Sequence, residues 1–98
     1  MAQNLPAQQK TVCIIGAGLT GLVAAYRLAR QGRAVILLES TLEAGGMAAT
    51  FPLGQTRLEH IYHHFFTSDT HLIELVEELG LQNKLSYHET RDALYSDG

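Results

Sequence analysis

The apolar positions at the start of the chain form two short runs separated by an amphipathic stretch. Residues 11–15 (TVCII) and residues 34–38 (AVILL) are mainly apolar and rich in β-branched side chains, as is typical of strands covered on both faces in a parallel sheet. Good helix formers run from Leu19 to about Gln31, and Gly32 is placed to end a helix there. The pattern predicts a strand–helix–strand unit in an α/β fold with a parallel sheet.

Two further elements are expected in the middle of the chain. Residues 50–58 are expected to form a hairpin or a loop with Gly54 at its turn. A second helix is predicted over residues 69–79, with Ser68 or Thr67 as its cap. Its apolar residues recur at helical spacing: Leu72, Leu75, Val76 and Leu79.

The two ends of the chain carry the weakest patterns. Residues 85–88 and 93–95 are short runs joined by polar residues, and we expect them to begin an antiparallel sheet. The polar residues 1–9 are expected to be a disordered tail. The folded part is therefore expected over residues 10–98.

The long apolar stretch near the amino terminus, residues 12–29, raises the question of a membrane segment. A spanning helix needs about 20 mainly apolar residues, and a signal peptide needs a compact apolar stretch before a small-residue cleavage site. Three glycines and Arg27 interrupt the stretch, so it fits neither description. We expect no membrane segment and a cytoplasmic protein.

The composition is that of an ordinary globular protein, with 46% hydrophobic residues, 17% charged residues and a formal charge of −3. Seven Lys and Arg in an acidic chain give no basic footprint for nucleic acid. Cys13 is the single cysteine, which excludes an internal disulfide and suits a reducing compartment. Its apolar neighbours indicate a buried small hydrophobe.

The turn after the first predicted strand matches the pattern G-x-G-x-x-G at Gly16, Gly18 and Gly21. The first glycine permits a tight turn, the second lets the backbone approach a pyrophosphate, and the third lets the helix pack closely on the strand. The pattern follows a strand and opens a helix, which is the context that the motif requires. It predicts a Rossmann-like, dinucleotide-binding βαβ unit.

An acid closes the second predicted strand. Glu39 lies 23 positions after Gly16, where a carboxylate is expected to accept hydrogen bonds from ribose hydroxyls. A carboxylate would repel a 2′-phosphate, so an NADP-type adenosine is disfavoured.

A glycine pair, Gly45-Gly46, follows the acid at six and seven positions. With the preceding motif it resembles the amino-terminal FAD-binding segment of the flavin amine oxidase, protoporphyrinogen oxidase and phytoene desaturase superfamily, where such a pair lies in a loop that approaches the flavin end of FAD. The resemblance implies FAD as the cofactor. The cofactor-binding residues predicted in this way are Gly16, Gly18, Leu19, Thr20, Gly21, Glu39, Ser40, Gly45, Gly46 and Met47.

The chain also departs from this superfamily. Met47 stands where many members have an arginine after the glycine pair, and Glu43 stands at another position that is commonly basic. The stretch LEHIYHHFFTSDTHLIELVEELGL is similar to a bacterial branch of the superfamily with unassigned substrates.

Four histidines lie close together after the hairpin or loop predicted over residues 50–58: His60, His63, His64 and His71. No cysteine or H-E-x-x-H spacing accompanies them, so a metal site is not expected. One interpretation is that they are loop residues packed against neighbouring aromatic rings. The resemblance implies another, because the segment after the glycine pair runs near the flavin in that superfamily. There Glu59, Tyr62, His63 or His64 could position substrate or exchange a proton near neutral pH.

The length of 98 residues is small for such an enzyme. We expect the chain to be an incomplete FAD-binding domain, the amino-terminal piece of a flavin-dependent oxidoreductase that acts on a small-molecule substrate, with the remainder of its own polypeptide as its partner. These residues alone are expected to be inactive. The alternatives are a non-redox flavoenzyme resembling UDP-galactopyranose mutase and a stand-alone nucleotide-binding module without catalysis.

Overall fold

The computed structural model describes residues 10–91, 93, 95 and 96. They form two compact units, the first ending at His63 and the second beginning at His64. The expectation of a disordered tail falls on residues 1–9, outside the described part.

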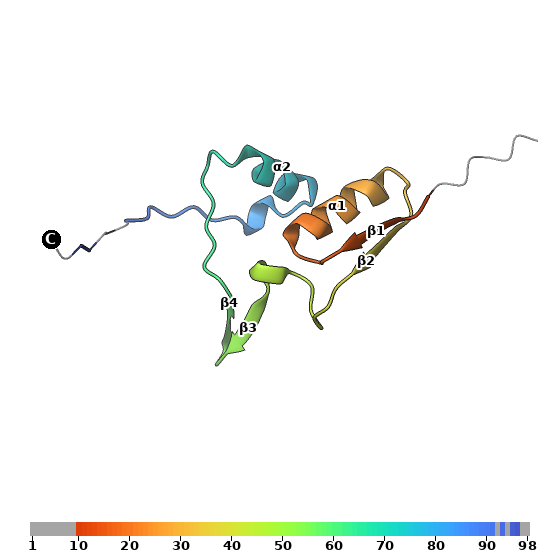
Figure 1. Cartoon of the computed structure of the whole chain (residues 1–98). Helices are drawn as coiled ribbons and strands as arrows, with labels where there is room; N and C mark the ends of the chain where they lie inside the picture. The colour runs from red at the N-terminus through yellow and green to blue at the C-terminus, as the bar shows by residue number, and fades with distance from the viewer. Residues whose placement is uncertain (1–9, 92, 94, 97–98) are drawn as a thin grey trace, which may run out of the picture. The chain divides into compact units, whose positions relative to one another are not determined.

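The first unit contains the strand–helix–strand arrangement that the sequence predicts. Strands β1 (Val12–Ile15) and β2 (Val35–Leu38) pair in parallel, and helix α1 (Leu19–Arg30) connects them across one face of the two-stranded sheet (Figure 1). The register places Val12 opposite Val35 and Ile15 opposite Leu38. The predicted α/β fold with a Rossmann-like βαβ unit is confirmed.

The sheet is covered on one face only, so the expectation of strands buried on both faces is wrong for these residues. In β1, Val12 and Ile14 are half-buried, whereas Cys13 and Ile15 are exposed, Ile15 at 87%. Successive side chains of a strand point to opposite faces, and α1 covers only one of them. Cys13 is therefore not the buried residue that its apolar neighbours indicated.

A β-hairpin completes the first unit, which resolves the choice between a hairpin and a loop. Strands β3 (Thr50–Leu53) and β4 (Thr56–Glu59) pair in antiparallel, with Thr50 opposite Glu59. Gly54 has φ +59° in the connecting turn, a backbone conformation that glycine adopts without steric cost. A short 3₁₀ helix, η1 (Gly46–Ala48), precedes the hairpin.

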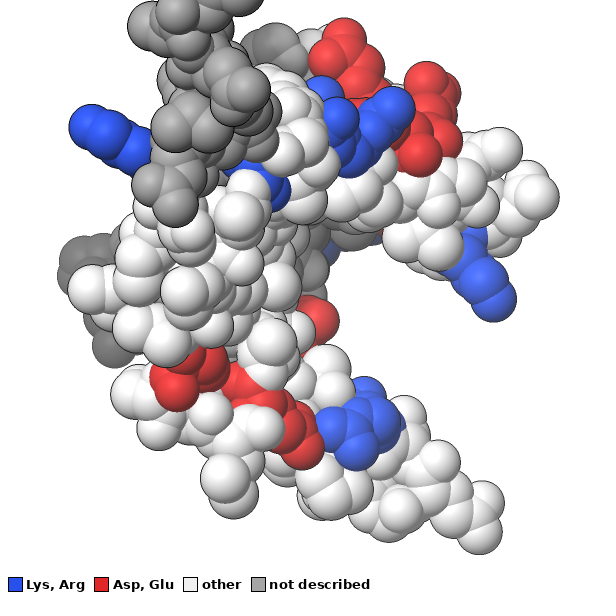
Figure 2. Space-filling model, turned by 90° about the vertical axis from the view of Figure 1, so that its right-hand side faces the viewer, with Lys and Arg blue, Asp and Glu red and all other residues white. Residues whose placement is uncertain are grey.

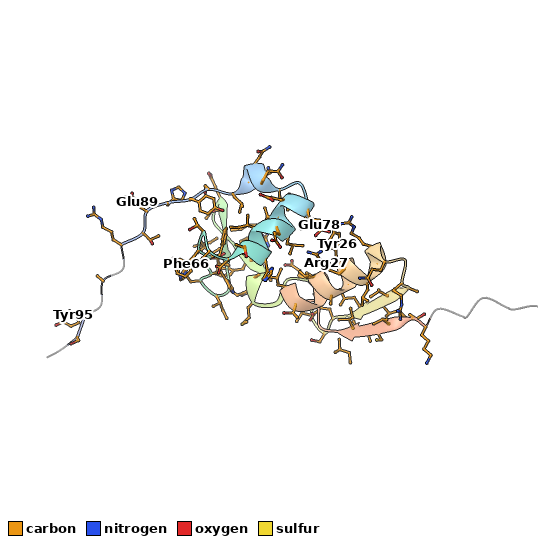
Figure 3. The ribbon with its side chains drawn as sticks, turned by 90° about the horizontal axis from the view of Figure 1, so that it is seen from above. Tyr26, Arg27, Phe66, Glu78, Glu89 and Tyr95 are labelled. Carbon is orange, nitrogen blue, oxygen red and sulfur yellow. The ribbon has the colours of Figure 1, made fainter. Side chains whose placement is uncertain are left out.

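The second unit contains helix α2 (Thr70–Glu78) and a 3₁₀ turn, η2 (Gln82–Lys84). The helix agrees with the sequence prediction, but its cap does not, because Asp69 occupies the N-cap position instead of Ser68 or Thr67. The Asp69 carboxylate accepts a hydrogen bond from the backbone N–H of Phe66 at 2.8 Å. Figure 3 labels Phe66 in the segment that leads into this helix.

The strands predicted over residues 85–88 and 93–95 are absent from the described residues of those segments, which carry no regular secondary structure. A strand is stable only when its backbone groups pair with another strand. The apolar pattern of a segment predicts a strand but does not identify the second strand with which it pairs. The described residues provide no such second strand at this point. Leu94 lies outside the described residues.

Charged side chains are dispersed over the surface. On the face drawn in Figure 2, the described Lys and Arg residues lie among acidic and uncharged ones and form no broad basic patch. Among the described residues, no helix combines the length and apolar character needed to cross a membrane.

Candidate functional site

The glycine motif forms a sharp turn between β1 and α1. Gly16 has φ +97°, and its N–H donates to the carbonyl of Leu38 at 2.7 Å, which ties the turn to the end of β2. A Cβ atom at Gly21 would collide with the carbonyl oxygen of Gly16. The third glycine of the motif is therefore required for the close packing of α1 on β1, as the sequence predicts.

The amino terminus of α1 is built from backbone groups. Gly18 is its N-cap residue and makes no side-chain capping hydrogen bond, and the first turn contains no acidic residue. The first N–H groups of a helix have no acceptor within the helix, and the helix dipole adds partial positive charge there. This end of α1 is suited to an anion such as a phosphate.

The glycine pair lies against the same turn. The Gly45 N–H donates to the carbonyl of Ala17 at 2.7 Å, and Gly18 and Gly45 form an isolated parallel bridge. A Cβ atom at Gly46 would lie 3.0 Å from the Cα of Gly18, which is too close for an ordinary contact. Gly45 and Gly46 also have φ values of +126° and +57°. Both steric space and backbone conformation therefore favour glycine at this pair.

Glu39 connects the motif to the loop that carries the glycine pair. One carboxylate oxygen, Oε2, accepts a hydrogen bond from the Ala17 N–H at 2.7 Å. The other, Oε1, accepts from the Thr41 N–H at 2.9 Å and the Thr41 hydroxyl at 3.0 Å, and from the Ser40 hydroxyl at 3.3 Å. The backbone N–H groups of Thr41 and Ala17 lower the pKa of Glu39 to about 2. The side chain is therefore a carboxylate at neutral pH.

A cleft of about 740 Å³ opens beside the motif. The predicted cofactor-binding residues that line it are Gly16, Gly18, Leu19, Thr20, Gly21, Gly45, Gly46 and Met47. Glu39 lines a neighbouring cleft of about 510 Å³, and Gly46 borders both clefts. Ser40 lines neither but is held against Glu39 by its hydroxyl. The structure thus brings together residues from β1, α1 and the loop after β2.

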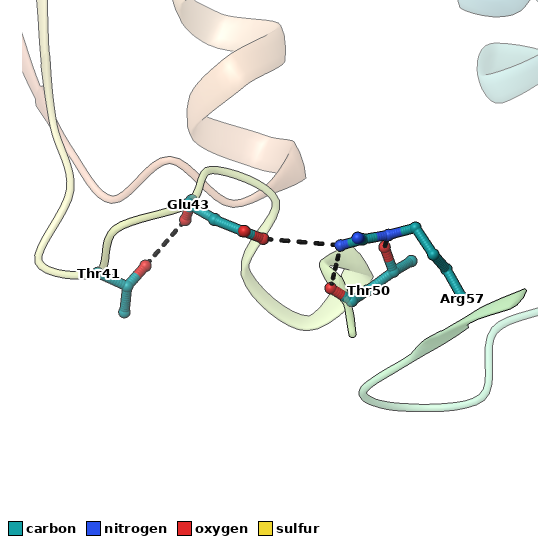
Figure 4. A network of polar contacts seen from close by, with 4 residues as sticks. All are labelled: Thr41, Glu43, Thr50 and Arg57. Atoms are coloured by element: carbon teal, nitrogen blue, oxygen red, sulfur yellow. Dashed lines mark hydrogen bonds and ion pairs between the residues drawn. The ribbon is translucent and has the colours of Figure 1, made fainter. Parts of the chain in front are cut away.

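A polar network fixes that loop to the hairpin (Figure 4). Arg57 on β4 donates from Nε to the Thr50 hydroxyl and from Nη2 to the Thr50 carbonyl, both at 2.8 Å. Nη2 also lies 4.0 Å from a carboxylate oxygen of Glu43, whose backbone carbonyl accepts a hydrogen bond from the Thr41 hydroxyl at 2.8 Å. Glu43 is therefore the acidic partner of an arginine in this structure.

The histidine segment divides between different surroundings. His63 lines the cleft of the glycine motif, and its backbone N–H donates to the Glu59 carboxylate at 3.3 Å. The ring of His64 packs edge-on against Phe66 at 5.1 Å in the second unit. Tyr62 lines a separate cleft of about 430 Å³, together with Glu59. Of the four residues singled out in this segment of the sequence, only His63 lines the cleft of the predicted cofactor-binding residues.

Two more histidines have partners of their own. His60 packs against Phe51 at 5.3 Å between ring centroids, and His71 on α2 pairs with Glu74 at 3.5 Å. Among the residues that the structure describes, no three His, Cys, Asp or Glu side chains are grouped so that they could hold a metal ion.

Three structural contributors were missed in the sequence. Ala17 supplies both the N–H that binds Glu39 and the carbonyl that binds Gly45. Thr41 holds the other oxygen of Glu39, a contact that its place two residues after an acid could have suggested. Arg57 is brought to the loop by the hairpin, and no local pattern indicates this.

Comparison with known proteins gives consistent results. A family model described as an NAD(P)-binding Rossmann-like domain matches residues 14–79. The chain is 36% identical over 88 residues to an L-amino acid oxidase from Cerastes cerastes, an alignment that covers 88% of this chain and 17% of that protein. It is 35% identical over 81 residues to a putrescine oxidase from Kocuria rosea, covering 83% and 17%. A flavin-containing monooxygenase, FMO GS-OX-like 8, from Arabidopsis thaliana is 32% identical over 75 residues, covering 69% and 16%. The chain thus spans about a sixth of the length of these relatives.

Proposed function

Because the chain belongs to the family of NAD(P)-binding Rossmann-like domains, we propose that it is the FAD-binding portion of a flavin-dependent oxidoreductase. The close approach of Gly18 to Gly46 beside the uncapped end of α1 carries this proposal. At that point two backbone segments meet, and a side chain at Gly46 would fill the space between them. Such an arrangement suits the diphosphate of a dinucleotide, which is recognised by backbone N–H groups.

Two observations favour FAD over NAD. The glycine pair adds a second glycine-rich segment to the motif and lines the same cleft. The relatives include proteins named as a flavin-containing monooxygenase, amino-acid and putrescine oxidases, and a zeta-carotene desaturase. The ionised Glu39 would repel a 2′-phosphate, which disfavours an NADP-type adenosine.

The residues of the site fit this cofactor. The N–H groups at the start of α1 would hold the diphosphate, and the Gly45-Gly46 backbone would lie alongside it. Oε2 of Glu39 accepts one protein hydrogen bond, and a carboxylate oxygen has two lone-pair sites. It therefore retains capacity for a ribose hydroxyl. When bound, FAD would supply the redox chemistry, as the acceptor of a hydride from a substrate C–H bond while a C–N or C–C bond is oxidised.

The proposal extends to the whole protein that carries these residues. It includes a small-molecule substrate, which the names of the L-amino acid oxidase and putrescine oxidase relatives support. It also includes a cytoplasmic location, which suits a chain with one cysteine. The oxidase, monooxygenase and desaturase names of the relatives support redox chemistry over a non-redox flavoenzyme or a module without catalysis.

A reduction experiment tests the redox function. The FAD-loaded whole protein, mixed anaerobically with panels of amines, amino acids and polyenes, should lose its oxidised-flavin absorbance with at least one substrate class. Admission of oxygen or another acceptor should restore it. Turnover of a sugar nucleotide without net oxidation, and no reduction by any panel, would contradict the oxidoreductase proposal and favour the non-redox alternative.

A further inference from the structure

His63 is the one ionisable side chain among the residues that line the cleft of the glycine motif. We propose that protonated His63 binds the anionic dinucleotide there and makes its affinity depend on pH. This inference rests on the proposed function, because it takes a dinucleotide diphosphate as the ligand of the cleft. It adds a residue and a mode of regulation to that site.

The lining of the cleft is otherwise almost without polar side chains. Apart from His63, Thr20 is the only lining residue with a hydroxyl, amide or charged group in its side chain. The other lining residues are glycines and apolar residues, and none of them is Lys or Arg. The described residues of the cleft therefore offer an anion the backbone N–H groups of α1 and a single side chain that can become a cation.

An acidic side chain contacts the backbone of His63. The His63 N–H donates to the carboxylate of Glu59 at the end of β4, which places one negative charge on the adjoining element. The residues that face it across the cleft, from β1, α1 and η1, carry no ionisable side chain. Charges within a cleft interact over the Debye length of about 8–10 Å at physiological salt, so an imidazolium that lines the cleft attracts a bound diphosphate.

The sign of the pH dependence follows from linkage. An anion beside His63 stabilises the protonated imidazole, so binding and proton uptake are coupled. The gain in affinity is therefore largest at low pH and is lost as the pH rises. Imidazoles ordinarily titrate near pH 6.5. Glu39 remains ionised over this range because its pKa is about 2.

The test is a titration of FAD into the whole apoprotein between about pH 5.5 and pH 8.5, a range that spans imidazole titration. Affinity should fall about tenfold or more across this range, the size expected for one hydrogen bond to a charged group. Calorimetry in buffers of different ionisation enthalpy should show proton uptake on binding near pH 7. His63→Gln should remove most of the pH dependence and the proton uptake, and should bind as the parent does at high pH.

Two further variants keep the outcome clear. His63→Lys keeps a positive charge throughout the range and should bind tightly at both ends of it. His71→Gln removes an imidazole whose side chain is 99% exposed and paired with Glu74 on α2, and should retain the parental pH dependence. A parental pH profile and proton uptake in folded His63→Gln would overturn the inference. Failure of the parent to bind FAD at any pH would instead overturn the proposed function.

Discussion

Gly18→Val should abolish measurable FAD binding by the whole protein while leaving it folded. Gly18 has φ −71°, which any residue adopts, and a Cβ there would lie 4.0 Å from the nearest atom, the Cα of Gly46. The first side-chain atom is therefore accommodated, whereas the two methyl groups of valine would take up space in the cleft that Gly18 lines, where a diphosphate would approach the backbone. Loss of one or two charge-assisted hydrogen bonds predicts about a hundredfold or greater loss of affinity.

Gly21→Ala is the matched comparison, because it should lower the stability of the fold, whereas Gly18→Val should lower the affinity for FAD. Its Cβ would collide with the carbonyl oxygen of Gly16, so α1 or the turn must shift, at a cost of about 1–3 kcal/mol of unfolding free energy as for an overpacked core. Thermal unfolding and flavin fluorescence measure the two effects separately. Parental FAD affinity in a folded Gly18→Val variant would show that the nucleotide does not approach between Gly18 and Gly46.

Glu39→Gln should weaken FAD binding by about ten- to a hundredfold, the range expected for a hydrogen bond to a charged group. The amide keeps the shape of the side chain but removes its charge, and its NH₂ group must face N–H donors at Ala17 or at Thr41. The change therefore affects both the proposed ribose contact and the hydrogen bonds that shape the loop. Equilibrium titration of the apoprotein with FAD measures it.

Glu43→Gln is the control for charge on the same loop. Glu43 is exposed and lies 4.0 Å from Arg57, and exposed ion pairs of this kind contribute little. Its FAD affinity should stay close to that of the parent. Equal affinities of the Glu39 and Glu43 variants would show that Glu39 has no special part in binding the cofactor.

The βαβ unit and the glycine turn were predictable because the apolar pattern of the sequence and the positions that sterically require glycine indicate the same structure. Two apolar runs flank a helix-forming stretch, Gly16 has a positive φ that favours glycine, and Gly21 lies where a Cβ atom would collide with the backbone. The glycine pair was predictable only from the resemblance. Its close approach to Gly18 joins segments that are 28 positions apart in the sequence, and no periodicity encodes such a contact.

Burial was harder to predict than secondary structure. The β1 sequence is apolar at every position, which indicated cover on both faces, yet Cys13 and Ile15 are exposed. The identity of a residue sets its preference for burial, whereas its burial depends on which element lies against it. The same limit applies to residues 85–88, where a strand-like run lacks a partner among the described residues.

The histidines illustrate a third limit. Their closeness in the sequence suggested a shared role, but His63 lines the cleft of the glycine motif, whereas His64 contacts Phe66. His60 contacts Phe51 and lines the neighbouring cleft with Glu39. In an extended or irregular segment, neighbouring side chains point in different directions. The closeness of the histidines in the sequence therefore did not identify which of them line the clefts.

The identity of the bound dinucleotide tests the central claim most directly. The whole protein, purified without added cofactor and then denatured, should release FAD, identified by chromatography and mass, in an amount approaching one per polypeptide. A yellow native protein with an oxidised flavin spectrum should accompany this result. Release of NAD or NADP without flavin would contradict the account, because the glycine motif, Glu39 and the glycine pair would then serve a different cofactor.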